Sequence, residues 1–281
     1  MKRQVENEST GLGSPGNRCG VYFDANGKLA NSQCQDPPAI PTSRDTDFME
    51  PRQDLARLYT ADDGARTKLP VDKSNSDLQA GYDRVAEHYA TEFFEELKRK
   101  PFDCQLLEDF ATSVKGAGVV CELGCGPGQI ARYLKDRGVN MRGIDLSSEM
   151  VRVATRLNPD IPFQQADMLA LDLEDNSLAA LVLFYSIIHL KREDVIRALQ
   201  EMHRVLNPGG KLFMAFHGGE GELHRDEWYG ETVSIDFRLF QGDEMSSYLE
   251  AAGFVDIKIL ERAPYEFEYP TKRLYAFASK A

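Results

Sequence analysis

The chain has 281 residues, of which 42% are hydrophobic, and its formal net charge is −12 at pH 7. This composition can build a globular core, whereas the charge disfavours a nucleic-acid partner and an anionic membrane surface. No apolar run approaches the roughly 20 residues that span a bilayer, and polar residues follow Met1-Lys2-Arg3 where a signal peptide would have its apolar core. We therefore expect a cytosolic protein.

Residues 1–75 are rich in Gly, Pro, Ser, Asn and Asp and have no apolar periodicity. This pattern predicts a flexible or weakly structured extension. Two alternatives stay open: a small hairpin around Asn26-Gly27, and an arm that packs over the active site or a neighbouring subunit. We expect residues 76–281 to form the folded domain.

Helices and strands alternate through most of that domain. The apolar spacing predicts helices over residues 78–98, 102–114, 129–137, 147–157 and 193–206, the fourth opened by a Ser-Ser-Glu cap. Strands are predicted over residues 118–123, 141–144, 163–166, 179–185 and 211–216, with Asn207–Gly210 as the turn before the last of them. The alternation predicts an α/β fold with a parallel sheet and helices on both faces, and residues 118–217 as its central, cofactor-binding part.

The C-terminal part has a different pattern. Residues 218–241 are polar and follow a strand end, so we expect a lid or substrate wall there. A helix over residues 243–252 and a strand pair over 255–261 and 273–278 should follow, adding an antiparallel edge to the sheet. Candidate substrate contacts are the aromatic Trp228, Tyr229, Phe237 and Phe240 and the basic Arg238, Lys272 and Arg273.

A glycine-rich segment, Glu122-Leu123-Gly124-Cys125-Gly126-Pro127-Gly128, joins the first predicted strand to a helix. Glycines let a backbone turn sharply and approach a ligand closely, and the helix that follows presents free N–H groups. In open α/β sheets, ligands bind beyond the carboxyl ends of the strands. The segment therefore predicts a nucleotide-type cofactor site.

Carboxylates follow the next two strands. Asp145 lies 17 residues after Gly128 and could accept hydrogen bonds from both ribose hydroxyls of an adenosine cofactor. Leu146 could pack on the adenine. Asp167 could accept a hydrogen bond from the adenine amino group, with Met168 beside the ring.

A dinucleotide cofactor fits this pattern less well. The motif G-x-G-x-x-G begun at Gly124 would need a glycine where Gln129 stands. Begun at Gly126, it permits Ala131 but leaves Glu122 without a role. An NAD-dependent oxidoreductase therefore stays as an alternative, as does a module that binds its cofactor without turnover.

Together these motifs resemble the class I S-adenosylmethionine-dependent methyltransferases that act on small molecules. The resemblance covers about residues 78–280 and depends on Glu122-x-Gly124-x-Gly126-x-Gly128, Asp145-Leu146-Ser147, Ala166-Asp167 and Val205-Leu206-Asn207-Pro208-Gly209-Gly210. It implies a Rossmann-like sheet of seven strands, mostly parallel, with an antiparallel last strand. It also implies S-adenosylmethionine as cofactor and methyl transfer to an O, N or C atom of a small molecule.

The resemblance further implies which residues contact the cofactor. The glycine loop would hold its methionine part, Asp145 the ribose and Asp167 the adenine, while the helix that carries Tyr82 and Tyr89 would cover it. The expected cofactor contacts are Tyr82, Tyr89, Glu122, Gly124, Cys125, Gly126, Gly128, Asp145, Leu146, Met150, Asp167, Met168, Phe184 and Tyr185.

A hydroxyl acceptor would also need a base, and histidine titrates near neutral pH. His189 follows the fourth predicted strand and His217 ends the fifth, so these are the candidate catalytic residues, with His224 as a further candidate. We expect no metal site, because neither Cys121 and Cys125 nor the histidines have the spacing of known ligand motifs. We expect a monomer or homodimer with a small-molecule substrate.

Overall fold

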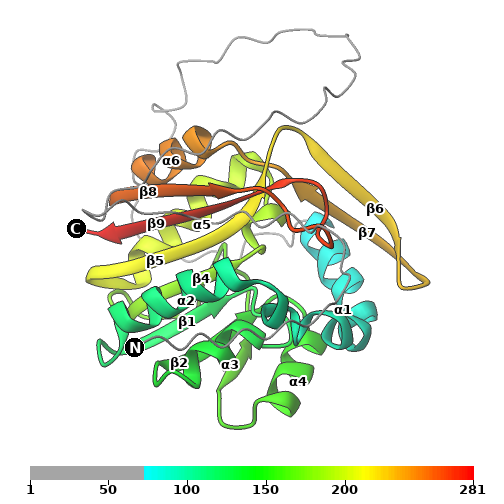
Figure 1. Cartoon of the computed structure of the whole chain (residues 1–281), viewed down its shortest axis with the longest axis horizontal. Helices are drawn as coiled ribbons and strands as arrows, with labels where there is room; N and C mark the ends of the chain where they lie inside the picture. The colour runs from blue at the N-terminus through cyan, green and yellow to red at the C-terminus, as the bar shows by residue number, and fades with distance from the viewer. Residues whose placement is uncertain (1–72) are drawn as a thin grey trace, which may run out of the picture. The chain divides into compact units, whose positions relative to one another are not determined.

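The computed structural model of the chain describes residues 73–281 (Figure 1). The expectations for residues 1–75, including the hairpin around Asn26-Gly27, lie outside the described residues except at the last three positions. Within the described part, no helix is both long and apolar enough to cross a membrane.

A seven-stranded sheet runs through the described part, and a separate antiparallel pair, β6 and β7, stands beside it. The strands are β1 (Val119–Leu123), β2 (Asn140–Asp145), β3 (Phe163–Gln165), β4 (Leu178–Phe184), β5 (Leu206–Gly218), β6 (Glu222–Trp228), β7 (Glu231–Arg238), β8 (Phe254–Arg262) and β9 (Lys272–Lys280). The order in the large sheet is β3-β2-β1-β4-β5-β9-β8.

Strands β1 to β5 pair in parallel, and β9 is antiparallel to both of its neighbours, β5 and β8. The predicted mostly parallel sheet of seven strands with an antiparallel last strand is therefore confirmed. One detail differs: β9 lies inside the sheet and β8 forms the edge, because β9 bonds to β5 on one side and to β8 on the other.

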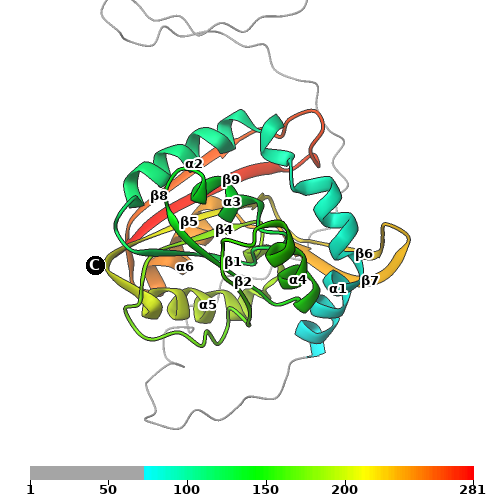
Figure 2. The same ribbon diagram turned by 90° about the horizontal axis from the view of Figure 1, so that it is seen from below.

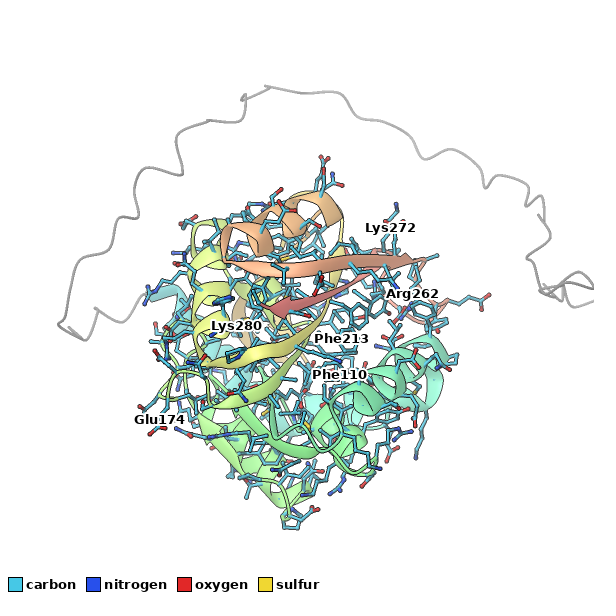
Figure 3. All side chains as sticks on the ribbon, turned by 90° about the vertical axis from the view of Figure 1, so that its left-hand side faces the viewer. Phe110, Glu174, Phe213, Arg262, Lys272 and Lys280 are labelled. Carbon is cyan, nitrogen blue, oxygen red and sulfur yellow. The ribbon has the colours of Figure 1, made fainter. Side chains whose placement is uncertain are left out.

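Helices cover both faces of the sheet, as the alternation predicts. They are α1 (Lys73–Phe93), η2 (Glu96–Arg99), α2 (Pro101–Val114), α3 (Gln129–Lys135), α4 (Ser148–Leu157), η3 (Ile187–His189), α5 (Arg192–Val205) and α6 (Gly242–Ala251). α2 and α3 pack on one face and α5 and α6 on the other (Figure 2). Figure 3 shows Phe110 of α2 and Phe213 of β5 directed toward one another, with ring centroids 5.4 Å apart.

Local signals explain several helix ends. Ser147 caps α4, because its hydroxyl accepts a hydrogen bond from the backbone N–H of Met150 at 3.1 Å, which confirms the predicted cap. The helix predicted over residues 78–98 instead ends at Phe93, and a 3₁₀ turn follows. Pro101 then opens α2 at its first position, where its missing N–H costs nothing.

Strand β5 begins earlier than predicted. Leu206 pairs with Leu178 and Lys211 with Ala180, so five steps along β5 match two steps along β4. Gly209 has a φ of 74°, a conformation that side chains disfavour. The predicted turn at Asn207–Gly210 is therefore a bulge within the strand.

The polar segment after β5 forms the hairpin of β6 and β7, which the sequence analysis did not predict. Tyr229 and Gly230, with φ values of 56° and 80°, make the two-residue turn. Val233 and Ile235 of β7 are buried against Val85 of α1. Figure 1 shows the hairpin running beside α1 at one end of the sheet.

Candidate functional site

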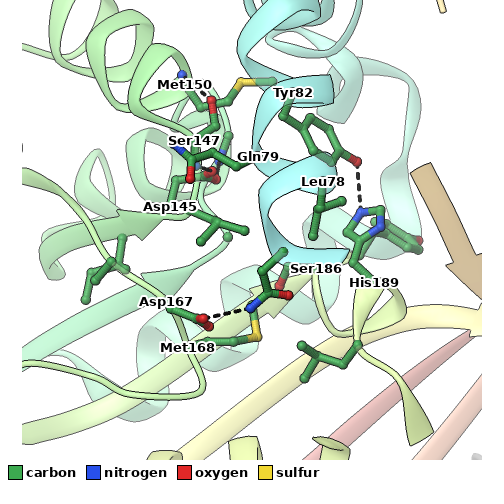
Figure 4. A pocket seen from close by; sticks show the side chains of 18 of the residues that line it. Leu78, Gln79, Tyr82, Asp145, Ser147, Met150, Asp167, Met168, Ser186 and His189 are labelled. Carbon is green, nitrogen blue, oxygen red and sulfur yellow. Dashed lines mark hydrogen bonds between the residues drawn. The ribbon is translucent and has the colours of Figure 1, made fainter. Parts of the chain in front are cut away.

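A cavity lies at the carboxyl ends of β1, β2, β3 and β4, beside α1 (Figure 4). Most of the expected cofactor contacts line it, namely Tyr82, Tyr89, Gly124, Gly126, Asp145, Leu146, Met150, Asp167, Met168, Phe184 and Tyr185. Glu122, Cys125 and Gly128 do not line it. The fold thus brings strand ends that are far apart in the sequence into one cavity.

The glycine loop forms the wall that follows β1. The backbone N–H groups of Gly124 and Cys125 both donate to the carbonyl of Ile144, at 2.8 and 3.0 Å, which ties the loop to β2. A Cβ on Gly124 would come within 2.2 Å of the Ser186 side chain, so no larger residue fits. Gly126, with a φ of 50°, donates its N–H to Asp145 at 2.7 Å. The loop and the Asp145 carboxylate are therefore held together.

The three expected contacts that do not line the cavity shape this loop from beneath. Glu122 is 1% exposed, and its carboxyl accepts a hydrogen bond from the N–H of Ala131 in α3 at 2.8 Å. Burial raises the pKa of Glu122 well above its usual value. Cys125 is buried in the same region. Gly128 has a φ of 82°, and a Cβ there would lie 2.8 Å from the ring of Phe163.

Asp145 ends β2 and points into the cavity. One carboxylate oxygen accepts the N–H of Gly126 at 2.7 Å and the other accepts the N–H of Ser147 at 2.9 Å. Burial raises its pKa to about 6, so the group is mainly ionised at neutral pH. A carboxylate has about four lone-pair directions, so these two bonds leave acceptor capacity for a pair of ligand hydroxyls.

Asp167 lies after β3 at another end of the cavity. One of its oxygens accepts the N–H of Leu169 at 2.9 Å, and the other accepts the side-chain amide of Asn75 at 2.8 Å (Figure 4). Met168 and Leu146 supply apolar surface nearby. A flat ring with an amino group would find both an acceptor and apolar walls here.

Several lining residues were missed by the sequence analysis: Asn75, Leu78, Gln79, Ile144, Ser147, Ala166, Ser186 and Leu190. Ile144, Ser147 and Ala166 adjoin predicted contacts at strand ends, so extending each predicted strand end by a residue or two would have found them. Leu78 and Gln79 lie within one turn of Tyr82 on α1, which carries a helical signal. Asn75 lies before this helical pattern, and no pattern in the sequence indicated that it would line the cavity.

The candidate bases occupy different places. His189 lines the cavity, its Nε2 lies 2.8 Å from the Tyr82 hydroxyl, and its removal from water lowers its pKa to about 4. His217 does not line the cavity; its Nδ1 lies 2.7 Å from the Thr271 hydroxyl, and burial and the nearby Arg273 lower its pKa to about 3. His224 is exposed on the hairpin and pairs with aspartates. Of the three, His189 is best placed for chemistry in the cavity.

The candidate substrate contacts have partners within the chain. Arg238 donates to the carbonyl of His189 at 3.0 Å, and Lys272 pairs with Glu261 at 2.7 Å. Arg273 is 3% exposed and donates to the Thr271 hydroxyl at 2.7 Å. Phe240 is fully buried in the core rather than in the cavity, because it packs against Phe216.

The remaining aromatic candidates gather around Tyr82. The ring centroids of Trp228 and Tyr82 lie 5.8 Å apart, and Phe237 packs on His189 at 5.1 Å. Tyr229 stacks on Trp228 farther along the hairpin. Among residues 73–281, no group of three His, Cys, Asp or Glu side chains is arranged to hold a metal ion.

Known proteins resemble this chain in sequence. A family model described as a methyltransferase domain matches residues 120–210. The malonyl-[acyl-carrier protein] O-methyltransferase of Enterobacter lignolyticus is 33% identical over 144 residues, which is 51% of this chain and 53% of that protein. YqeM of Bacillus subtilis, described as a candidate methyltransferase, is 30% identical over 182 residues, or 61% of this chain and 73% of that protein.

This chain belongs to the class I S-adenosylmethionine-dependent methyltransferases. A member of known structure, an S-adenosylmethionine-dependent methyltransferase from Methanosarcina mazei, has the same fold, with a TM-score of 0.53 and 19% identity over 58% of this chain and 92% of that one. This methyltransferase chain spans about half the length of the Enterobacter relative. The family relationship accounts for the cavity at the strand ends, where S-adenosylmethionine is the expected cofactor.

Proposed function

We propose that this chain transfers a methyl group from S-adenosylmethionine to an O, N or C atom of a small molecule. The observation that supports this most strongly is the convergence of Gly126, Asp145 and Asp167 on one cavity. A net charge of −12 and the absence of a basic cluster in the sequence favour a small-molecule substrate over a nucleic acid or an anionic membrane. We keep a cytosolic monomer or homodimer as part of the proposal.

The residues of the cavity fit the cofactor. Asp145 has free lone pairs for the two ribose hydroxyls, and Asp167 has an acceptor oxygen beside the apolar Met168 for the adenine. Gly126 lines the cavity without a side chain, which leaves room for the methionine part to pass over the loop. Glu122 and Gly128 would act through the shape of the loop, and Phe184 and Tyr185 would lie beside the methionine part.

When bound, the cofactor supplies a methyl group on a positively charged sulfur. The protein's contribution is to hold the acceptor in line and to exclude water, and positioning of this kind contributes roughly 7–11 kcal/mol. Tyr82 and Tyr89 of α1 line the cavity opposite the strand ends and would exclude water. The low pKa values of His189 and His217 keep both rings neutral at pH 7. A proton from the acceptor could reach His189 Nε2 only through the Tyr82 hydroxyl, which already contacts it.

Thermal melting with added ligands tests the proposed function. S-adenosylhomocysteine should raise the melting temperature in a concentration-dependent way, because it binds only the folded state. NAD at the same concentrations should not. The reverse pattern would contradict the proposal and favour the oxidoreductase alternative. Release of S-adenosylhomocysteine in the presence of an acceptor would then separate an enzyme from a module that only binds the cofactor.

A further inference from the structure

A second cavity adjoins the first. Asn75, Leu78, His189 and Leu190 line both cavities, so the two meet at these side chains. The second cavity is polar, with Arg238 among the residues that line it. His189 therefore lies at the boundary between the proposed cofactor cavity and the second cavity.

The hydrogen bonds of His189 fix its tautomer. Its Nδ1 lies 2.9 Å from the backbone carbonyl of Asp236, and a carbonyl oxygen can only accept, so Nδ1 carries the proton. The ring stays neutral near pH 7, because burial lowers its pKa to about 4. Nε2 is then an acceptor, and the hydroxyl of Tyr82, 2.8 Å away, must donate to it.

This hydrogen bond fixes the hydroxyl proton of Tyr82 and therefore the direction of the lone pairs on the Tyr82 oxygen. The only hydroxyl proton of Tyr82 is taken up by His189, so the oxygen can act toward the cavity only as an acceptor. Burial and the nearby Asp145 raise the pKa of Tyr82 far above its usual value, so the group is a neutral phenol whose oxygen carries a partial negative charge. Figure 4 shows Tyr82 and His189 together on the side of the cavity away from Asp167.

We propose that His189 holds the Tyr82 oxygen toward the positively charged sulfur of S-adenosylmethionine, at the junction where the acceptor enters from the second cavity. This inference rests on the proposed function. The sulfur is bonded to the exocyclic 5′ carbon of the ribose, so Asp145 would position the sulfur by binding the ribose. The methyl group on the sulfur must also face the acceptor. Of the side chains that line both cavities, Asn75 is bonded to Asp167 at the proposed adenine end, whereas His189 lies away from Asp167. We therefore expect the sulfur at the His189 end of this boundary. Tyr82 would contact the cofactor, and His189 is a positioning residue that acts through Tyr82.

The charge on the sulfur makes the inference testable without knowing the acceptor. S-adenosylmethionine carries a positive sulfonium, whereas S-adenosylhomocysteine has a neutral thioether and is otherwise alike. The measured quantity is the discrimination ratio, defined as the dissociation constant for S-adenosylhomocysteine divided by that for S-adenosylmethionine, from isothermal titration. Tyr82→Phe removes one oxygen and nothing else, so the ratio should fall about tenfold to a hundredfold, the size expected for losing one contact to a charged group. Tyr229→Phe makes the same change on the hairpin turn and should leave the ratio unchanged.

Two substitutions at His189 separate positioning from packing. His189→Leu removes the acceptor for the Tyr82 hydroxyl, so the ratio should fall. His189→Gln restores an oxygen acceptor, so its ratio should lie closer to that of the unaltered protein. Equal losses of affinity for both ligands in Tyr82→Phe, or an unchanged ratio in both Tyr82→Phe and His189→Leu, would overturn the inference. Failure of the unaltered protein to bind either ligand would instead refute the proposed function.

Discussion

Replacing Asp145 by asparagine tests the proposed ribose contact most directly. The amide keeps one acceptor oxygen and loses the charge, so one of two charge-assisted hydrogen bonds to the ribose is lost. Such a bond contributes about 1.5–3 kcal/mol, and a loss of about 2 kcal/mol corresponds to roughly 30-fold weaker binding. Isothermal titration with S-adenosylhomocysteine measures it. Asp160→Asn removes the same charge at an exposed ion pair and serves as the control.

The fold should tolerate the Asp145→Asn change. The amide leaves one of the N–H groups of Gly126 and Ser147 without its acceptor, which costs stability. It also removes a charge whose burial is unfavourable, as the raised pKa of about 6 shows. These effects oppose each other, so the melting temperature should change little. Unaltered affinity for the ligand in a variant that melts normally would refute the role assigned to Asp145.

The pH dependence gives a second check on the same residue. Because the pKa of Asp145 is about 6, the unaltered protein should lose affinity for S-adenosylhomocysteine as the pH falls from 7 to 5, while Asp145→Asn should not. The effect on folding has the opposite sign. A folded-state pKa above the usual 3.8 means that the stabilising contribution of Asp145 is present below pH 3.8 and is lost as the pH rises through about 6.

Six further substitutions, arranged in three pairs, test the framework of the site by urea unfolding. Gly128 has a φ of 82°, and an added Cβ would contact a neighbouring ring, so Gly128→Ala should lower the free energy of unfolding by about 2–4 kcal/mol. Gly116 has a φ of 77° but open space around it, so Gly116→Ala should lower the free energy of unfolding by only about 1–2 kcal/mol. Glu122→Leu orphans a buried N–H and should cost about 1–3 kcal/mol, whereas Glu122→Gln keeps an acceptor and should cost less. Arg262→Met removes the ion-pair partner of the buried Asp103 and one of the partners of Glu268, and it should cost about 3–5 kcal/mol. Lys272→Met breaks an exposed pair and should cost less than about 1 kcal/mol. Equal costs for the two glycine variants, equal costs for Arg262→Met and Lys272→Met, or no cost for Glu122→Leu would contradict this packing.

The sequence predicted the sheet and most of the cavity lining because their signals are local. Gly124, Gly126 and Asp145 follow apolar strands directly, and parallel strands end at the same edge of the sheet. The hairpin also had a local signal, since Val233 and Ile235 alternate with polar residues after a glycine turn, but the polar character of the whole segment concealed it.

Other features could not be read from the sequence, because they depend on contacts between distant segments. The partner of His217 is Thr271, 54 positions away, and this pairing turns a candidate base away from the cavity wall. The bond between Tyr82 and His189 spans 107 positions. Predicting the two contacts would require knowing how α1 and the loop before β9 pack, and the apolar periodicity of the sequence does not contain this information.

The contact between α1 and the hairpin has a consequence for synthesis on the ribosome. Arg84 of α1 donates to the carbonyl of Thr232 in β7 at 2.9 Å, across 148 positions of sequence. A nascent chain that ends before Thr232 therefore carries the glycine loop, both aspartates and α4, on which Ala86 and Ala90 of α1 pack, but it lacks the strand that buries Val85. Complete burial of α1 should therefore be a late event in biogenesis, following emergence of the hairpin rather than completion of the parallel strands.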